Sequence, residues 1–349
     1  MSKQTILVTG GLGFIGSHTV VELLQASYDV VVVDNLNNSR MQVLESIRRT
    51  SGKEIDFYPY DTRDEKAMKE VFEKHPNIAG VIHFAAYKAV GESVAEPLKY
   101  YDNNIYGLVA LLKQMQINGI KAMLFSSSCT VYGQPEKLPI SEQTPLKPAE
   151  SPYGNTKKMG EEIVVDATKT GAFKAISLRY FNPVGAHPDG FIGELPIGVP
   201  QNLIPFVTQT AAGLRKELSV FGNDYPTPDG TAIRDYIHVV DLAHVHVKAM
   251  ARLLNNEGPS YDVYNVGTGR GYSVLEVIEA FERVSGQALP YHFAPRRAGD
   301  VVQVYADANK AEQELQWKAQ YGIDDMLRDA WNFQKNILDE THILNEKES

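Results

Sequence analysis

A glycine-rich turn between a buried strand and a helix is the feature that most restricts how this chain folds. The segment TGGLGFIG at 9–16 directly follows the apolar run ILV, and a stretch of helix-like composition follows at 17–26. In this order, Gly10 permits a tight turn, Gly13 leaves room for phosphate groups, and Gly16 lets the helix pack close to the strand. The helix N-terminus adds free N–H groups and partial positive charge. The segment therefore predicts a dinucleotide-binding turn.

The next apolar run predicts which dinucleotide binds. The run VVVV at 30–33 ends at Asp34. That position is about 20 residues beyond the turn, where an acidic residue meets the hydroxyls of the adenosine ribose. A carboxylate there would repel a 2′-phosphate, and the nearest cation that follows is Arg40. We therefore expect NAD rather than NADP.

Strand-like runs alternate with helix-like stretches through the first half of the chain. This alternation predicts an α/β fold, a doubly wound parallel sheet (Rossmann-type) with helices on both faces. After Tyr180 the chain becomes rich in glycine and proline, which predicts a smaller C-terminal α/β substrate domain. We expect a dinucleotide-binding domain over 1–182 and a substrate domain over 183–349, with a segment near 234–243 returning to the first. The expected strands are 6–9, 30–34, 55–58, 80–84, 122–128 and 175–180.

Charge and cysteine content exclude several classes of protein. The formal net charge is −9 and no lysine- and arginine-rich run is present, so nucleic acid is not expected as a partner. Cys129 is the only cysteine, which excludes an internal disulfide and a thiolate zinc cluster and fits a reducing compartment. The sequence has no apolar stretch of membrane-spanning length and no secretory signal pattern. We therefore expect a cytoplasmic protein without a membrane partner.

A tyrosine and a lysine one helical turn apart form the second strong signal. In SPYGNTK at 151–157, Ser151 is placed to cap a helix with Pro152 in its first turn, so Tyr153 and Lys157 share a face. A phenol has a pKa of about 10 and alone is a poor base at neutral pH. A nearby ammonium group favours the phenolate. The pair therefore predicts a tyrosine that transfers protons.

Small hydroxyl side chains stand at the end of another predicted strand. The segment SSSCTVYG at 126–133 follows the apolar run AML. Hydroxyls at the carboxyl end of a strand can approach both a nicotinamide and a substrate, and a serine bonded to a reacting hydroxyl can help relay its proton. Ser126 and Ser128 are the candidates.

Three further motifs are interpreted as structural. The turn GTG at 267–269 resembles a phosphate loop but lacks a third glycine at the right place. His244 and His246 are two residues apart on a predicted helix and so point to different faces, and we expect no metal site. Nothing beside Cys129 marks it as an activated nucleophile, so we expect a buried, inert thiol.

The glycine turn at 10–16 together with Tyr153-x-x-x-Lys157 resembles the extended short-chain dehydrogenase/reductase superfamily, and more narrowly the UDP-glucose 4-epimerase family. The resemblance covers nearly the whole chain. The matching segments are VIHFAA at 81–86, KAVGES at 88–93, YYDNN at 100–104, FSSSCTVYG at 125–133, SPYGNTK at 151–157, RYFNPVGAH at 179–187, VFGNDYPT at 220–227, RDYIHV at 234–239 and RRAGD at 296–300.

The resemblance implies a reaction, the reversible 4-epimerisation of UDP-galactose and UDP-glucose. Tyr153 as phenolate would take the proton of the sugar 4-hydroxyl while hydride leaves C4 for tightly bound NAD. The 4-keto sugar would then turn over within the site and regain hydride on its opposite face. Ser128 would touch the 4-oxygen, and Lys157 would lower the pKa of the phenol and hold the nicotinamide ribose. A homodimer is also implied, and 183–349 becomes a nucleotide-sugar-binding domain.

The resemblance further implies two sets of binding residues. In the substrate set, Arg234 and Arg297 would hold the diphosphate, Asp300 the uridine ribose and Phe221 the uracil. The implied cofactor contacts are Gly10, Gly13, Phe14, Ile15, Gly16, Asp34, Asn35, Asn38, Ser39, Asp61, Thr62, Phe84, Ala85, Lys88, Asn103, Ser126, Tyr153, Lys157 and Tyr180. The implied substrate contacts are Ser128, Tyr153, Asn182, Asn202, Leu203, Phe221, Arg234, Arg297, Asp300 and Val304.

Several alternatives remain open at this point. Val304 stands where some members have tyrosine and others a small residue that admits an N-acetyl group, so UDP-N-acetylhexoses are possible additional substrates. A nucleotide-sugar 4,6-dehydratase would need an Asp-Glu pair where this chain has Cys129 and Thr130. A UDP-glucuronate 4-epimerase would need a cation or polar cluster for the 6-carboxylate. A non-catalytic NAD-binding module is disfavoured because both Tyr153 and Lys157 are retained.

Overall fold

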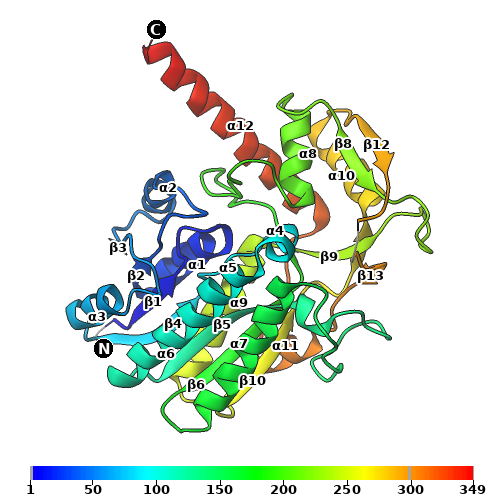
Figure 1. Ribbon diagram of the computed structural model, residues 1–349. Helices are drawn as coiled ribbons and strands as arrows, with labels where there is room; N and C mark the ends of the chain where they lie inside the picture. Colours follow the sequence, from blue (N-terminus) through cyan, green and yellow to red (C-terminus); the bar gives the residue numbers. More distant parts are fainter. Residues whose placement is uncertain (1–2, 298–299, 349) are drawn as a thin grey trace.

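A seven-stranded parallel sheet forms the larger part of the molecule (Figure 1). The computed structural model describes residues 3–297 and 300–348. Across the sheet the strands run in the order β10-β6-β5-β4-β1-β2-β3, and every neighbouring pair is parallel. Their bounds are β1 (Thr5–Thr9), β2 (Asp29–Val33), β3 (Asp56–Tyr58), β4 (Ile78–His83), β5 (Ala122–Ser128), β6 (Lys174–Tyr180) and β10 (Tyr261–Val266). The predicted doubly wound parallel sheet is confirmed.

Helices cover both faces of this sheet because successive side chains of a strand point to opposite faces. Ile6 and Val8 pack in one buried cluster, whereas Leu7 between them packs in another. The first cluster lies under α1 (Phe14–Gln25), α2 (Gln42–Ser51), α9 (Val239–Leu254) and α11 (Asn309–Glu314). The second lies under α3 (Glu65–Lys74), α6 (Gly107–Ile117) and α7 (Pro152–Thr168).

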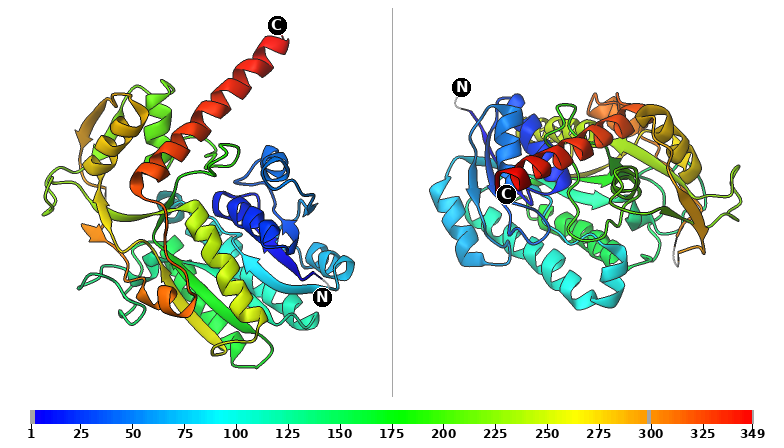
Figure 2. Two further views of the ribbon diagram at one scale, coloured as in Figure 1. Left: turned by 180° about the vertical axis from the view of Figure 1, so that it is seen from behind. Right: turned by 90° about the horizontal axis from the view of Figure 1, so that it is seen from above.

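A smaller lobe lies beyond the carboxyl ends of the strands (Figure 1). Its strands are β7 (Asn182–Val184), β9 (Ile233–His238), β11 (Gly271–Ser273) and β13 (Gln303–Val304), together with a separate pair, β8 (Leu218–Phe221) and β12 (Tyr291–Ala294). Its helices are α8 (Leu203–Ala211), α10 (Val274–Ser285) and α12 (Ile323–Glu348). A capping box formed by Ser273 and Glu276 opens α10. The end of α12 projects away from the body (Figure 2).

The chain returns to the large sheet after first entering the lobe. α9 packs on α1, and β10 is the outermost strand beside β6. The elements that return are therefore α9, β10 and α11, whereas residues 234–238 of the predicted segment belong to β9 in the lobe. The division into domains at 1–182 and 183–349 stays a prediction. Within 183–349, however, α9, β10 and α11 pack with the large sheet.

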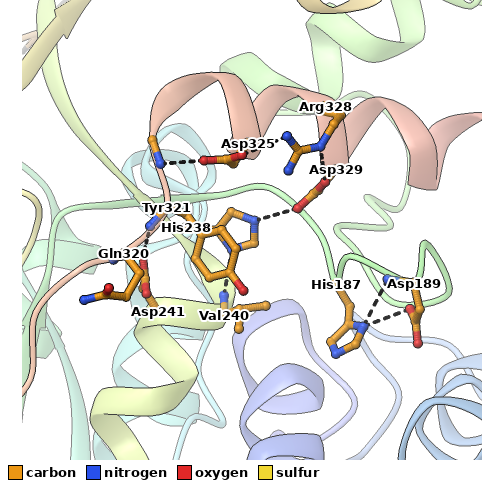
Figure 3. Close-up of polar contacts among 11 residues, drawn as sticks. His187, Asp189, His238, Val240, Asp241, Gln320, Tyr321, Asp325, Arg328 and Asp329 are labelled. Atoms are coloured by element: carbon orange, nitrogen blue, oxygen red, sulfur yellow. Dashed lines mark hydrogen bonds and ion pairs between the residues drawn. The ribbon is translucent and has the colours of Figure 1, made fainter.

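A buried polar junction connects the lobe to the sheet (Figure 3). His238 caps α9 by accepting the N–H of Val240 at 3.1 Å, so its Nε2 carries the proton and faces Asp329 of α12 at 3.3 Å. Its ring stacks on Tyr321, with centroids 4.3 Å apart. Asp241 accepts the N–H of Tyr321 at 3.0 Å. These contacts fasten the start of α12 to α9 and thereby set the lobe over the strand ends.

Candidate active site

The glycine turn joins β1 to α1 with almost no free space. The helix begins at Phe14, earlier than the predicted 17, with Gly13 as its N-cap. A Cβ on Gly16 would lie 2.2 Å from the carbonyl oxygen of Gly10. Gly10 itself has φ +69° and lies against the backbone of Ala85. Phe14 and Ile15 thus open the helix, where N–H groups have no acceptor within the helix.

Asp34 is held rigidly at the end of β2. Its carboxylate accepts the N–H of Leu12 in the glycine turn at 3.0 Å, the N–H of Leu36 at 2.9 Å and the hydroxyl of Ser39 at 2.7 Å. Asn35 and Asn38 of the same loop are exposed. The carboxylate therefore braces the turn and lies at the same strand edge.

A second carboxylate continues this loop cluster. Asn35 donates to Asp61 at 2.9 Å, and Arg63 donates to it through its backbone and guanidinium. Hydrogen bonding by Arg63 lowers the pKa of Asp61 to about 2, so the carboxylate stays charged. Thr62 is buried against Gly107. Sequence reasoning missed Arg63, although a cation directly after the Asp-Thr pair was a signal that could have found it.

The residues after β4 continue along the same strand edge. The N–H of Phe84 bonds to Thr9, and its ring lies 4.8 Å from that of His246, which in turn hydrogen-bonds Tyr180 at 2.6 Å. Asn103 is buried and donates to its neighbour Asn104. The structure thus brings the sequence-predicted residues Phe84, Ala85 and Tyr180 to one edge, beside the glycine turn.

Lys88 and Asn202 both hydrogen-bond to Glu194, a residue that sequence reasoning missed. Glu194 accepts from the Lys88 ammonium at 3.0 Å and from the Asn202 amide at 2.7 Å, both through Oε1. Leu203 follows directly as the first residue of α8. This carboxylate connects the cofactor side of the site to the lobe.

Tyr153, Lys157 and Ser128 come together between α7 and β5. Ser151 caps α7 by accepting the N–H of Gly154 at 3.1 Å, as predicted. Burial raises the pKa of Tyr153 to about 12, while a hydrogen bond from Ser128 acts to lower it. Burial lowers the pKa of Lys157 to about 8, and its ammonium donates to the carbonyl oxygen of Ser126 at 2.7 Å. At neutral pH the surroundings therefore favour a protonated phenol on Tyr153 and a charged amine on Lys157, one helical turn apart on α7.

The predicted substrate residues of the lobe also lie together. Arg234 on β9 pairs with Asp300 at 3.2 Å, and the guanidinium of Arg297 lies 3.9 Å from the ring centroid of Phe221. Ala298 and Gly299, within the predicted motif, lie outside the described residues. Asn182 begins β7, which pairs with β9. Two arginines that face one region of the lobe suit a diphosphate.

Val304 links this group to the end of β5. It lies opposite Arg234 in the register of β13 and β9, and it packs with Val131 in a cluster that includes Cys129. Arg234 acts electrostatically on Cys129, the residue after Ser128. The strand end and the arginine group thus border one region.

Comparisons with known proteins agree with this geometry. A family model described as GDP-mannose 4,6 dehydratase matches residues 7–330. A UDP-glucose 4-epimerase of Bacillus subtilis is 54% identical over 95% of this chain and 97% of its own. A crystal structure of UDP-glucose 4-epimerase from Bifidobacterium longum, in complex with NAD⁺ and UDP, is 51% identical, with a TM-score of 0.92 over 95% of this chain and 98% of its own.

The chain belongs to the UDP-glucose 4-epimerase family. This confirms the resemblance noted in the sequence. A UDP-Glc/GlcNAc 4-epimerase from Campylobacter jejuni is also similar, at 38% identity and a TM-score of 0.81 over 95% of this chain and 99% of its own. The dehydratase description belongs to the broader family model. This epimerase-family chain has Cys129 and Thr130 where dehydratase chemistry would need its acid and base.

The motifs interpreted as structural have partners within this epimerase-family fold. Buried Asp235 accepts the N–H groups of Thr268 and Gly269 at 2.8 and 3.0 Å, so an internal carboxylate occupies the phosphate-like turn. His244 pairs with Glu22 at 2.9 Å. Cys129 is partly exposed rather than fully buried as expected, and desolvation still raises the pKa of its thiol to about 12.

The described part of the chain spans residues 3–297 and 300–348. That part of the chain contains no group of three histidine, cysteine or acidic side chains placed to hold a metal ion. It also contains no helix with the length and apolar character needed to cross a bilayer.

Proposed function

We propose that this protein is an isomerase that interconverts UDP-galactose and UDP-glucose through transient, NAD-dependent oxidation at sugar C4. The observation that carries the proposal is the meeting of Tyr153, Ser128 and Lys157 at the strand edge that also holds the glycine turn. Relatives with about 50% sequence identity are named UDP-glucose 4-epimerases. Similar solved structures contain NAD.

The residues present fit a dinucleotide. The opening N–H groups of α1 suit a pyrophosphate, and the contact of Gly16 with Gly10 leaves that helix end close to the strand. Asp34 stands where an adenosine ribose would be held, and Lys157 and Tyr180 lie at the other end of the same edge. When bound, NAD supplies the capacity to accept a hydride from the sugar and to return it.

Proton transfer is assigned to Tyr153, with Ser128 and Lys157 in support. The phenol must lose its proton to act as a base, and burial opposes this by raising its pKa to about 12. Positive charge nearby favours the phenolate, so the Lys157 ammonium and the positive charge of an oxidised nicotinamide act in the required direction. The Ser128 hydroxyl, which bonds to Tyr153, can also donate to the sugar 4-oxygen.

The lobe is suited to hold the nucleotide part of the substrate firmly and the hexose part weakly. Arg234 and Arg297 offer two planar guanidinium groups to the diphosphate, with Asp300 and Phe221 beside them. The hexose end is bordered by the apolar side chain of Val304 and by short hydroxyl groups. Firm nucleotide binding with a weakly held hexose allows a 4-keto sugar to turn over without leaving.

The direct test incubates purified protein with UDP-galactose, without added oxidant or reductant. We expect UDP-glucose to form until an equilibrium mixture is reached, and we expect NAD to be released when the protein is denatured. Formation of a dehydrated keto sugar instead would favour the 4,6-dehydratase reading. Turnover of UDP-glucuronate in preference would favour a UDP-glucuronate 4-epimerase.

We further propose that UDP-N-acetylhexoses are accepted, because Val304, which the family resemblance places beside the sugar, is smaller than a tyrosine. Val304→Tyr should lower kcat/KM for UDP-N-acetylglucosamine by about tenfold or more, because one added group in a pocket is worth about 1–3 kcal/mol. Turnover of UDP-galactose should change much less. Competition between the two substrates measures the ratio, and an unchanged ratio would contradict this assignment.

We also propose a homodimer located in the cytoplasm. Val94 on α4 (Val90–Ala95), Leu98 on α5 (Pro97–Tyr101) and Tyr106 are large side chains that are 63%, 80% and 43% exposed. Exposed apolar side chains on neighbouring elements suit an isologous interface beside α7. Light scattering should give twice the mass of one chain, and Leu98→Glu should lower the measured mass to that of a single chain.

A further inference from the structure

A third side chain continues the helix face that carries Tyr153 and Lys157. Glu161 lies one further turn along α7, and it is 4% exposed. Its carboxylate accepts from the guanidinium of Arg179 at 2.9 and 2.6 Å and from the hydroxyl of Ser127. Ser127 is next to Ser128 on β5, so the Glu161 carboxylate connects α7 to the strand end that carries Ser128.

The Arg179 guanidinium also has a hydrogen-bond partner on the side that faces away from Glu161. Arg179 donates its remaining nitrogen to the hydroxyl of Tyr132 at 2.8 Å, and Tyr132 donates to the buried amide of Asn265 at 2.7 Å. This chain of hydrogen bonds runs from α7 through β6 to β10. A buried carboxylate with such partners has one position, and it holds its neighbours in one position.

Of the groups around Lys157, Glu161 is the one whose charge favours the ammonium form. The ammonium contacts the carbonyl of Ser126 and lies 5.3 Å from the ring centroid of Phe125. His83 on β4 is also close enough to be influenced by the Lys157 charge, but burial lowers the pKa of His83 to about 3, so it carries no charge at neutral pH. Glu161 opposes the effect of burial on Lys157. Arg179 is the cation paired with it.

We propose that Glu161 is a positioning residue that keeps the Lys157 ammonium charged and holds the end of β5 against α7. The inference rests on the proposed epimerase function. Burial disfavours an ammonium group, and a neighbouring carboxylate restores it. Glu161 thereby sets the pH above which Lys157 no longer supports the Tyr153 phenolate.

The test measures kcat for UDP-galactose between pH 6 and 10 in wild type and Glu161→Gln. Without the carboxylate, Lys157 loses its proton at lower pH, so the alkaline limb of the profile should move down by about 1 pH unit, as expected for loss of a nearby opposite charge. Lysine side-chain NMR, with Lys157 assigned by Lys157→Arg, should show the same shift in its midpoint. Glu162→Gln, an exposed neighbour on α7, is the matched control and should leave the limb in place.

Two further variants cover the case in which Glu161→Gln leaves Arg179 unpaired and the protein unfolds. Glu161→Gln combined with Arg179→Met removes both charges, and replacing a buried pair by apolar groups is often tolerated. Its alkaline limb should move in the same direction but by less, because removal of the Arg179 cation partly offsets the loss of the Glu161 carboxylate. Glu161→Asp should restore most of the wild-type profile. An unmoved alkaline limb, with kcat lowered equally at every pH, would overturn the proposal. Lack of UDP-galactose turnover by the wild type would instead overturn the proposed function.

Discussion

Tyr153→Phe should reduce the interconversion of UDP-galactose and UDP-glucose by about 10²- to 10⁴-fold, the range that general acid–base catalysis supplies. The substitution removes only the hydroxyl that hydrogen-bonds Ser128. The ring remains between α7 and β5, so packing and dinucleotide binding should persist. Coupled measurement of UDP-glucose formation gives the rate, and extraction after denaturation gives the bound NAD.

The matched control for this change is Tyr291→Phe. That tyrosine lies on β12 and is 40% exposed, so loss of its hydroxyl should leave kcat within about twofold, as is usual for surface substitutions. A Tyr153→Phe protein that retained the wild-type rate would show that another group transfers the proton. Loss of bound NAD together with the rate would show that Tyr153 mainly binds the cofactor.

Gly16→Ala should nearly abolish dinucleotide binding and lower the free energy of unfolding by about 1–3 kcal/mol, as overpacking does. The added Cβ would lie 2.2 Å from the carbonyl oxygen of Gly10 and 2.9 Å from the Cα of Gly11. Both are backbone atoms, so no side-chain movement relieves the overlap and the turn has to open. Opening displaces the helix end that is proposed to receive the pyrophosphate. Thermal unfolding and NAD content after purification measure the two effects.

Gly91→Ala is the control for this prediction. Gly91 also lies in a helix, α4, but a Cβ there would meet nothing within 4 Å. Alanine is favoured over glycine in helices, so this variant should be as stable as the wild type or slightly more stable. Equal NAD content in the two variants would contradict the role assigned to the close packing of Gly16.

The elements of the large sheet were predictable because their signals are local. Apolar runs that are bounded by polar residues indicate buried strands, and the six predicted strands match β1 to β6 with ends shifted by at most two residues. Ser151 was identified as a cap because hydroxyl capping depends on residues three positions away. The helix start at Phe14 was missed because glycine-rich sequence does not itself indicate a helix.

Several site contacts were not predictable because their partners are far apart in the sequence. Glu194 meets Lys88 across more than a hundred residues, and Asp235 meets the 267–269 turn only when β9 lies beside it. Glu161 shares a helix face with Lys157, yet its pairing with Arg179 depends on how α7 packs over β6.

By itself, the order of residues determined the dinucleotide turn, the Tyr153–Lys157 spacing and the parallel sheet, since each depends on hydrogen bonds and side-chain periodicity within a few residues. The tertiary structure decided that β10 and α9 return to the first sheet and that His238 and Asp329 fasten the lobe above it. It also decided how far the pKa values of Tyr153 and Lys157 depart from those of free side chains. These outcomes depend on which distant surfaces exclude water from one another, and only the packed chain settles that.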